Sequence, residues 1–379
     1  MSQKTATWAL IGVLFLSLSA CNNNQSSPNS QSESNPEEEV IEERLILENA
    51  TLNQVNSDGE TLWKLEVKKV VYRQNKEKAE LEAVKGELYQ DGNIFLQIEA
   101  NQGEIIDNGK QINLQGEVVA TDPRNGAVLK SEKLEWSPED QLLVIPQPLT
   151  GSNPRFNVSA DQGKYHTDQE ELELIGNVEG VSNESPLRLK GKQLNWLIPE
   201  DVVQTNQSLQ VDRYDSETET ITDQVTANSG KVNLDQKMVF LKDNVEFKSS
   251  DPPLQAASNA ITWDMEKKLL RSEKPIKVVQ NEDKITLTGN QGQIDLETEI
   301  ARFQGGVKGV SESNQAVLFA NRLQWNLPTQ EMTAKGDVIY QQTNPSLTSK
   351  GEEATGILQN KNIVVKGSKQ ERVTTEIVP

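Results

Sequence analysis

The sequence repeats a short phrase about every 31 residues, and this periodicity constrains the fold more than any other feature. In each copy two apolar residues alternate with other residues and are followed by a small residue. The small residues are Ala100, Ser131, Ala160, Gly191, Ala227, Ser258, Gly289, Ala320 and Gly351. With one more copy around Lys69, about ten copies fit between Gly59 and Gly367, and the one long step falls in the acidic stretch 213–223. A unit this short cannot close a core alone, so neighbouring units must stack and share one interior.

Within each copy the apolar residues recur at every second position, which is the pattern of a β-strand with one buried face. The clearest examples are the runs 112–118, 172–178, 239–245 and 301–307. Asp91–Asn93 and Asp107–Gly109 have the composition of turns between strands. After the N-terminal region, no segment shows the apolar stripe of a helix. The sequence therefore predicts an elongated all-β body in which two antiparallel sheets face each other across their apolar rows.

Composition argues against several classes of function. The chain has one histidine, His166, and one cysteine, Cys21, too few for a Cys/His zinc site, a disulfide framework or a redox pair. The formal net charge of −19 disfavours binding to nucleic acid. The sequence contains neither a phosphate-binding P-loop nor an EF-hand loop. We therefore expect no catalytic residue, no metal site and no cofactor, and interpret His166 as an exposed or locally bonded imidazole.

The N-terminus has the form of a bacterial lipoprotein signal. An apolar run from Trp8 leads to the tetrapeptide Leu18–Cys21, which resembles a lipobox. The sequence predicts a signal peptide at residues 1–20 and a lipid anchor on Cys21. The alternative is an uncleaved membrane helix, but that needs roughly 20 apolar residues, and this run is shorter. Asn22, which follows the cysteine, does not decide between the inner and the outer membrane.

Residues 21–44 consist almost entirely of Asn, Ser, Gln, Glu and Pro. A segment of this composition cannot bury enough apolar surface to offset the loss of chain entropy on ordering. We predict a disordered acidic linker here. The expected location is therefore the periplasm, with the folded body tethered to a membrane through the lipid on Cys21.

Some of the alternating apolar residues are candidates for contact with an apolar ligand. These groove candidates are Leu65, Val67, Leu96, Ile98, Leu129, Phe156, Val158, Leu187, Leu189, Leu287 and Leu318. The alternative is that each simply fills the interior that any sandwich must fill. Four tryptophans recur at equivalent positions, which favours a repeated packing role over contact with a ligand. They are Trp136, Trp196, Trp263 and Trp325.

Two segments carry a resemblance to a known family. They are residues 58–93 (DGETLWKLEVKKVVYRQNKEKAELEAVKGELYQDGN) and 98–118 (IEANQGEIIDNGKQINLQGEV). They resemble the LptC/LptA/OstA family of periplasmic lipopolysaccharide-transport proteins, most closely an extended, lipid-anchored LptC. The resemblance implies an OstA-like β-jellyroll of about ten repeats whose apolar interior holds the acyl chains of lipopolysaccharide. It also implies no enzymatic activity.

The resemblance implies a division of the chain and a set of partners. Residues 45–205 would form an N-terminal LptC-like jellyroll, residues 206–367 would continue it, and residues 368–379 would be a tail. Lipopolysaccharide would arrive from LptF/LptG-like subunits of an inner-membrane transporter. It would leave toward an LptA-like protein or the periplasmic domain of LptD. The chain differs from the usual LptC in its lipid anchor and in being about twice as long. We expect the anchor to lie in the inner membrane.

Family members join by adding strand to strand at exposed sheet edges, so the resemblance also implies two docking edges. At the N-terminal end the predicted edge contains Trp63 and Leu65. At the C-terminal end it contains Ile363, Val364 and Val365. The alternative is that lysines near the C-terminal edge merely prevent pairing with other chains.

A function of a different class remains open beside lipid transport. The body could be a structural outer-membrane lipoprotein that binds polysaccharide or another protein through its stacked strands. The two functions differ in what the apolar interior contacts: acyl chains in the first, only the protein's own side chains in the second.

Overall fold

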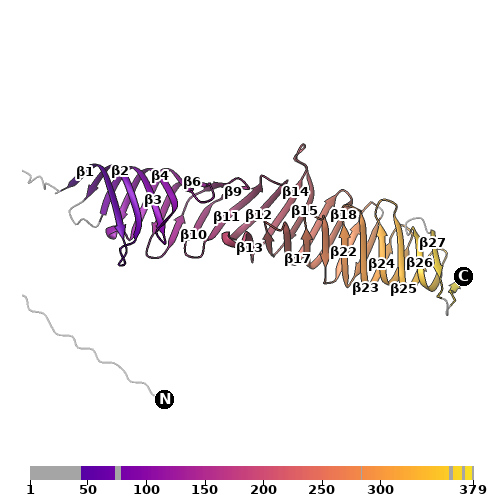
Figure 1. Ribbon diagram of the computed structural model, residues 1–379. Helices are drawn as coiled ribbons and strands as arrows, with labels where there is room; N and C mark the ends of the chain where they lie inside the picture. Colours follow the sequence, from indigo (N-terminus) through magenta and orange to yellow (C-terminus); the bar gives the residue numbers. More distant parts are fainter. Residues whose placement is uncertain (1–43, 73–77, 283, 358–361, 369–371, 378–379) are drawn as a thin grey trace, which may run out of the picture. The chain divides into compact units, whose positions relative to one another are not determined.

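The computed structural model describes residues 44–72, 78–282, 284–357, 362–368 and 372–377. Within these ranges the chain forms β-strands and two single 3₁₀ turns, which confirms the predicted all-β class. Figure 1 shows the strands following one another in chain order along an elongated β-jellyroll body. The predicted signal peptide, Cys21 and all but the last residue of the predicted linker lie outside the described residues.

The first strands of the body run from the N-terminal end to the middle. They are β1 (Leu45–Val55), β2 (Thr61–Tyr72), β3 (Lys78–Gln90), β4 (Asn93–Ile106), β5 (Gln111–Asp122), β6 (Ala127–Ser137), β7 (Leu142–Ile145), β8 (Leu149–Ser152), β9 (Phe156–Ala160), β10 (Gln162–His166), β11 (Glu171–Ser182), β12 (Leu187–Leu197), β13 (Val202–Thr205) and β14 (Leu209–Tyr214). The 3₁₀ turns are η1 (Asp107–Gly109) and η2 (Ile198–Glu200).

The remaining strands complete the body toward the C-terminus. They are β15 (Ile221–Ala227), β16 (Ser229–Asn233), β17 (Met238–Ser250), β18 (Pro253–Asp264), β19 (Leu269–Ser272), β20 (Ile276–Gln280), β21 (Ile285–Gly289), β22 (Gln291–Asp295), β23 (Ile300–Ser311), β24 (Ala316–Asn326), β25 (Glu331–Gln342), β26 (Leu347–Ile357), β27 (Asn362–Lys366) and β28 (Thr374–Ile377). The long step of the repeat lies in the hairpin of β14 and β15, which projects from the body in Figure 1.

All strand pairs are antiparallel, and the chain reverses direction alternately at two edges of one long sheet. Several short strands are two halves of one longer strand. For example, β7 and β8 both pair with β6, one with each half of it. The undivided strands carry a register shift at the same place, as β11 does between Ile175 and Val178. The sheet therefore bends along its middle, and its two halves face each other.

The nine repeated small residues lie at this bend, either beside a register shift or at the end of a half-strand. The inside of the bend is crowded. A Cβ on Gly351 would lie 2.6 Å from the carbonyl oxygen of Lys366, closer than non-bonded atoms approach. The small residue in each sequence repeat therefore marks the point at which the sheet bends.

The interior contains two clusters of buried apolar residues. The first extends along the chain from Trp63 to Leu194 and the second from Leu209 to Ala354. Leu189 is partly buried and packs against both clusters. Because each cluster draws residues from both halves of the bent sheet, the core is the space enclosed between the halves, as in a sandwich.

The N-terminal edge of the sheet differs from the sequence expectation. Trp63 and Leu65 lie in β2, which pairs with β1 on one side and β3 on the other, and both side chains are buried. The edge strand is β1, whose Leu47, Ala50 and Leu52 are only half-buried against the first core cluster and whose Leu45 and Ile46 are exposed. The edge of the sheet thus lies one strand further out than Trp63 and Leu65, the residues at which the sequence placed it.

The C-terminal end has two short strands at its edge. Ile363, Val364 and Val365 lie in β27, which pairs only with β26 among the described residues. Part of the predicted tail is also ordered, because β28 pairs with the other half of β26. The side chain of Val364 is 52% exposed.

Candidate functional site

The half-buried apolar residues of the body gather in its middle, where the first core cluster ends and the second begins. A pocket of about 110 Å³ lies there between the two halves of the sheet. Its apolar lining consists of Phe156, Val158, Leu174, Leu187, Leu189, Leu194, Trp196, Val203, Val211, Val232, Leu234 and Met265. We call this feature the central pocket; it is a local widening of the shared interior.

A cross-strand row of small and aliphatic residues forms one wall of the central pocket. Gly180 in β11 pairs with Val158 on one side and Leu189 on the other, and Leu189 pairs with Val211. A Cβ on Gly180 would have no heavy atom within 4 Å. The widening therefore coincides with a position at which the row lacks a side chain.

An aromatic pair borders the central pocket. Phe156 and Trp196 meet edge to face, with 6.1 Å between ring centroids. The same type of pair recurs between Phe247 and Trp263 at 5.8 Å, but there both rings are buried, with exposures of 0% and 1%. Phe156 and Trp196 are only half-buried. The same type of aromatic pair is thus fully buried between β17 and β18 and only half-buried at the central pocket.

Ion pairs join the two edges of the bent sheet on the N-terminal side of the pocket. Arg124 donates to Glu170 at 2.8 Å, and Arg155 donates to Asp201 at 2.6 Å. Each pair links a turn on one edge to a turn on the other, so we call the line of contact the seam. The hydrogen bond and charge of Asp201 raise the pKa of Arg155 above its ordinary value. The Arg155 guanidinium also lies 5.2 Å from the ring centroid of Phe156, at the rim of the pocket.

The seam is open beside the central pocket. The next turn on one edge contributes Glu184 and Ser185 to the lining, and the facing edge contributes Lys237 and Met265. Among the described residues, the ion pair of Glu184 is with Arg155 on its own edge, at 3.9 Å, and Lys237 has none. No ion pair therefore crosses this part of the seam, and the apolar wall of the pocket adjoins solvent there.

A comparison with known protein families identifies the family to which this chain belongs. The family model described as lipopolysaccharide-assembly, LptC-related, matches residues 9–184 and 209–312. The chain belongs to the LptC-related family. The segment between the two matched stretches contains β12 and β13, which form part of the pocket wall. A search of curated proteins gives no match.

Membership of the LptC-related family places the chain in lipopolysaccharide transport at the cell envelope. In the described part of the chain, no helix is long and apolar enough to cross a bilayer. The same residues contain no cluster of three or more His, Cys, Asp or Glu side chains suited to a metal ion.

The structure separates the eleven groove candidates of this LptC-related chain into three groups. Four of them line the central pocket: Phe156, Val158, Leu187 and Leu189. Two, Leu96 and Leu129, are half-buried and pack against the first core cluster. The other five are buried within the two clusters, with exposures of 4% or less: Leu65, Val67, Ile98, Leu287 and Leu318.

Several pocket residues were missing from the sequence candidates. Leu174, Val211 and Leu234 occupy positions in the same alternating pattern, so the pattern could have identified them. Trp196 was assigned a packing role, yet it both packs against Phe156 and borders the pocket. The position without a side chain, Gly180, gives no apolar signal at all and was not singled out.

Proposed function

We propose that this chain is a bridge component of lipopolysaccharide export. It accepts lipopolysaccharide from LptF/LptG-like subunits of an inner-membrane ABC transporter. It passes the lipid through its apolar interior toward an LptA-like protein or the periplasmic domain of LptD. A lipid anchor on Cys21 would keep the body at the inner membrane.

The observation that carries this proposal is the central pocket, in which half-buried apolar side chains lie beside an open stretch of the seam. Burying one CH₂ group in such a site stabilises a complex by about 0.8 kcal/mol. An acyl chain inserted from the seam would contact Leu187, Leu189 and the Phe156–Trp196 pair. The sugars of the same lipid would remain in water outside the seam.

The size of the pocket adds a requirement. Its volume of about 110 Å³ is well below the roughly 300–1,000 Å³ of a typical site for a small molecule. The two halves of the sheet must therefore move apart before a whole acyl chain can enter. The Arg155–Asp201 pair is the contact across the seam that borders the pocket, so we propose that it controls this opening.

The sheet edges supply the docking surfaces of the proposed bridge. At the C-terminal end, β27 can accept a strand from the next protein through the backbone groups of Ile363, Val364 and Val365. At the N-terminal end, β1 replaces β2 as the strand available for docking to the transporter. Both strands pair on one side only among the described residues.

The test combines photo-crosslinking with a substitution that fills the pocket. A photoreactive residue at Leu187 should crosslink to lipopolysaccharide in cells, whereas one at Lys190, which lies in β12 outside the lining of the pocket, should not. Gly180→Leu should reduce the Leu187 crosslink at least tenfold, because the added side chain occupies the open space. Val181→Leu enlarges the neighbouring side chain of the same strand and serves as the control.

Two results would contradict the proposal. One is a Leu187 probe that labels only neighbouring protein while a probe at Lys190 captures glycan, which would favour the structural outer-membrane lipoprotein. The other is a Gly180→Leu protein that is folded by circular dichroism and retains full crosslinking. Depletion of the protein gives a further check, because loss of a bridge should make lipopolysaccharide accumulate in the inner membrane.

A further inference from the structure

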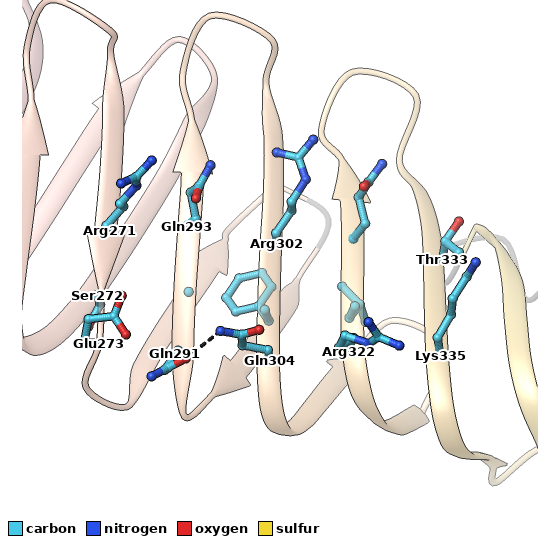
Figure 2. A pocket seen from close by; sticks show the side chains of 14 residues that line it. Arg271, Ser272, Glu273, Gln291, Gln293, Arg302, Gln304, Arg322, Thr333 and Lys335 are labelled. Carbon is cyan, nitrogen blue, oxygen red and sulfur yellow. Dashed lines mark hydrogen bonds between the residues drawn. The ribbon is translucent and has the colours of Figure 1, made fainter.

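The outer face of β19, β22, β23, β24 and β25 carries an unusual set of side chains. Two cross-strand rows lie side by side on it (Figure 2). The pairing of neighbouring strands places in the first row Arg271, Gln293, Arg302, Gln324 and Thr333. The second row contains Gln291, Gln304, Arg322 and Lys335. We call this surface the arginine–glutamine face; it lines a hollow of about 720 Å³.

The arginines of this face lack carboxylate partners. Along β5–β15, each of Arg124, Arg155, Arg188 and Arg213 forms an ion pair with an Asp or Glu. Among the described residues, no ion pair involves Arg271, Arg302 or Arg322. In a chain with 57 acidic and 38 basic side chains, three unpaired arginines on one face call for an explanation.

Three carboxylates lie near this face, and none of them forms an ion pair with its arginines among the described residues: Glu273, Asp295 and Glu353. Glu273 belongs to the lining but forms no ion pair among the described residues. Asp295 is held mainly by backbone N–H groups of its own turn, which lower its pKa, and Arg302 makes only a minor contribution.

Two like charges are also placed directly opposite each other. Arg322 in β24 is the cross-strand partner of Lys335 in β25, an arrangement that destabilises a sheet unless a counter-charge is near. Lys335 has such a counter-charge in Glu353, at 3.5 Å, but Arg322 does not. A bound anion would supply it.

The equivalent face of the N-terminal part has the same geometry and a different charge. It forms a second hollow whose charged lining residues are Lys69, Glu80, Glu82, Glu104 and Lys133, so carboxylates outnumber cations. In the arginine–glutamine face four cations stand against Glu273. The positive face is therefore a property of these five strands and not of the fold.

We propose that the arginine–glutamine face binds an extended anionic polysaccharide. Arg271 and Arg302 stand two strands apart in the first row, about 10 Å, and Arg322 follows in the second row on β24, so a chain lying across the strands would meet three guanidinium groups. Guanidinium groups bind carboxylates and phosphates in a bidentate manner. The interleaved Gln amides can donate to and accept from sugar hydroxyls. Gln304 already donates to Gln291 at 2.5 Å, which aligns one such amide pair.

The composition of the face favours a sugar chain over a protein. Protein interfaces are usually anchored by exposed aromatic or large aliphatic side chains. The apolar residues of this lining, Phe303 and Leu323, are buried and point into the core. The face also lies on the outside of the sheet, so the polysaccharide would bind independently of any lipid in the central pocket.

The negative charge of the whole chain does not prevent this binding. At physiological ionic strength the Debye length is about 8 Å. Carboxylates elsewhere on the body are then screened, whereas the cations beneath the ligand are not. Binding should therefore persist at 0.15 M salt and weaken strongly toward 1 M.

The test is a titration of the protein with lipid-free polygalacturonate, followed by calorimetry at 0.15 M salt. The double variant Arg302→Gln/Arg322→Gln should lower the affinity at least tenfold. Lys69→Gln/Lys133→Gln removes two cations from the equivalent N-terminal face and should change it less than twofold. Arg302 and Arg322 are exposed and Lys69 and Lys133 are half-buried, and circular dichroism will verify that both variants fold.

Two further probes complete the test. Neutral dextran should not bind, because it offers no anion to the arginines. Polyglutamate should bind at least tenfold more weakly than polygalacturonate. The proposal is overturned if polygalacturonate does not bind, if the arginine variant leaves its affinity unchanged, or if polyglutamate binds equally well. None of these results bears on lipid transport, which the crosslinks at Leu187 report separately.

Discussion

The central part of the body and its C-terminal part share one repeat, yet only the central part is open. Leu187 and Leu189 are half-buried and line a pocket, whereas Leu287 and Leu318, chosen by the same alternation, are buried at 0% and 2%. The difference shows that alternation determines which face of a strand turns inward. It does not determine whether the enclosed space is filled.

One position of the repeat carries side chains of very different size in different units. Gly180 stands two residues after Val178, and Phe247 stands two residues after Val245 at the corresponding place in β17. Phe247 fills the interior and packs on Trp263, while Gly180 leaves its space empty. A glycine at this point is not sufficient to widen the core, because Gly309 occupies the same place in β23 between Leu287 and Leu318, and both leucines are buried. The side chains that neighbouring strands send into the space beside the glycine must also differ.

The largest expected effect comes from truncating equivalent tryptophans in the two regions. Trp325 is fully buried, so Trp325→Ala should cost about 3–5 kcal/mol of unfolding free energy through lost packing and a new cavity. Trp196→Ala should cost clearly less, because its ring is already half-exposed beside the pocket. Urea unfolding with hydrogen exchange would resolve the loss for each region separately, since a stacked body need not unfold in one step.

Equal losses for Trp196→Ala and Trp325→Ala would mean that the central pocket is as tightly packed as the rest. Trp263→Ala provides the control, because Trp263 is 1% exposed and should behave like Trp325. The comparison uses the same residue type at the same place in the repeat, so side-chain size and strand position are held constant.

A smaller effect is expected at the seam. Arg155→Gln removes a partly exposed ion pair with Asp201, which should cost about 1 kcal/mol or less of stability. It should nevertheless make the Phe156–Trp196 pair more accessible, because the contact at the rim of the pocket is lost. Acrylamide quenching in a protein whose other tryptophans are replaced by Phe would measure that accessibility.

Lys190→Gln is the matched control for the seam variant. Lys190 pairs with Glu179 at 3.8 Å between neighbouring strands of one half of the sheet and lies outside the pocket lining, so its loss should not open the seam. If both substitutions changed quenching at Trp196 equally, the Arg155–Asp201 pair would have no special role in closing the pocket.

Much of the fold follows from the sequence because the physics of a bent strand repeats in every unit. Crowding inside the bend requires the small residues, and the shared core requires the alternation of apolar residues. Both features therefore recur at regular intervals in the sequence. The edge strand β1 leaves a weaker trace. Its Leu47, Ala50 and Leu52 pack against the first core cluster but stay half-buried, and the adjacent Leu45 and Ile46 are exposed.

The site was less predictable than the fold for a related reason. Phe156, Val158, Leu187 and Leu189 were identified as groove candidates, but so were residues such as Ile98 that prove to be core. The distinction depends on which side chains from several strands fill the space beside Gly180 and on ion pairs between turns far apart in the chain. Neither is a local property, so neither can be read from the pattern of one strand.

The smallest expected effect concerns the turns that follow the equivalent tryptophans. Asp264 follows Trp263 and accepts a hydrogen bond from the backbone N–H of Lys267 at 2.9 Å, which is the main reason its pKa lies below the ordinary value. In the central region Leu197 follows Trp196 and offers no such acceptor. Folding lowers the pKa of Asp264, so the ionised carboxylate stabilises the folded state. This contribution is complete at pH values above the pKa of the unfolded chain, which is near 3.9. It is lost as the pH falls through the lower value of the folded state.

Asp264→Asn should therefore remove a pH-dependent part of the free energy of unfolding. This part is at most a few tenths of a kcal/mol, which is typical of an exposed charged interaction. Amide exchange of residues 265–268 should accelerate between pH 5 and pH 2.5 in the unmodified protein beyond the intrinsic change, and not in the variant. Exchange in the η2 turn, residues 198–200, should follow the intrinsic rate in both proteins. An equal acceleration in η2 would show that acid loosens the whole body, and the turns would then contribute nothing to the contrast between its central and C-terminal parts.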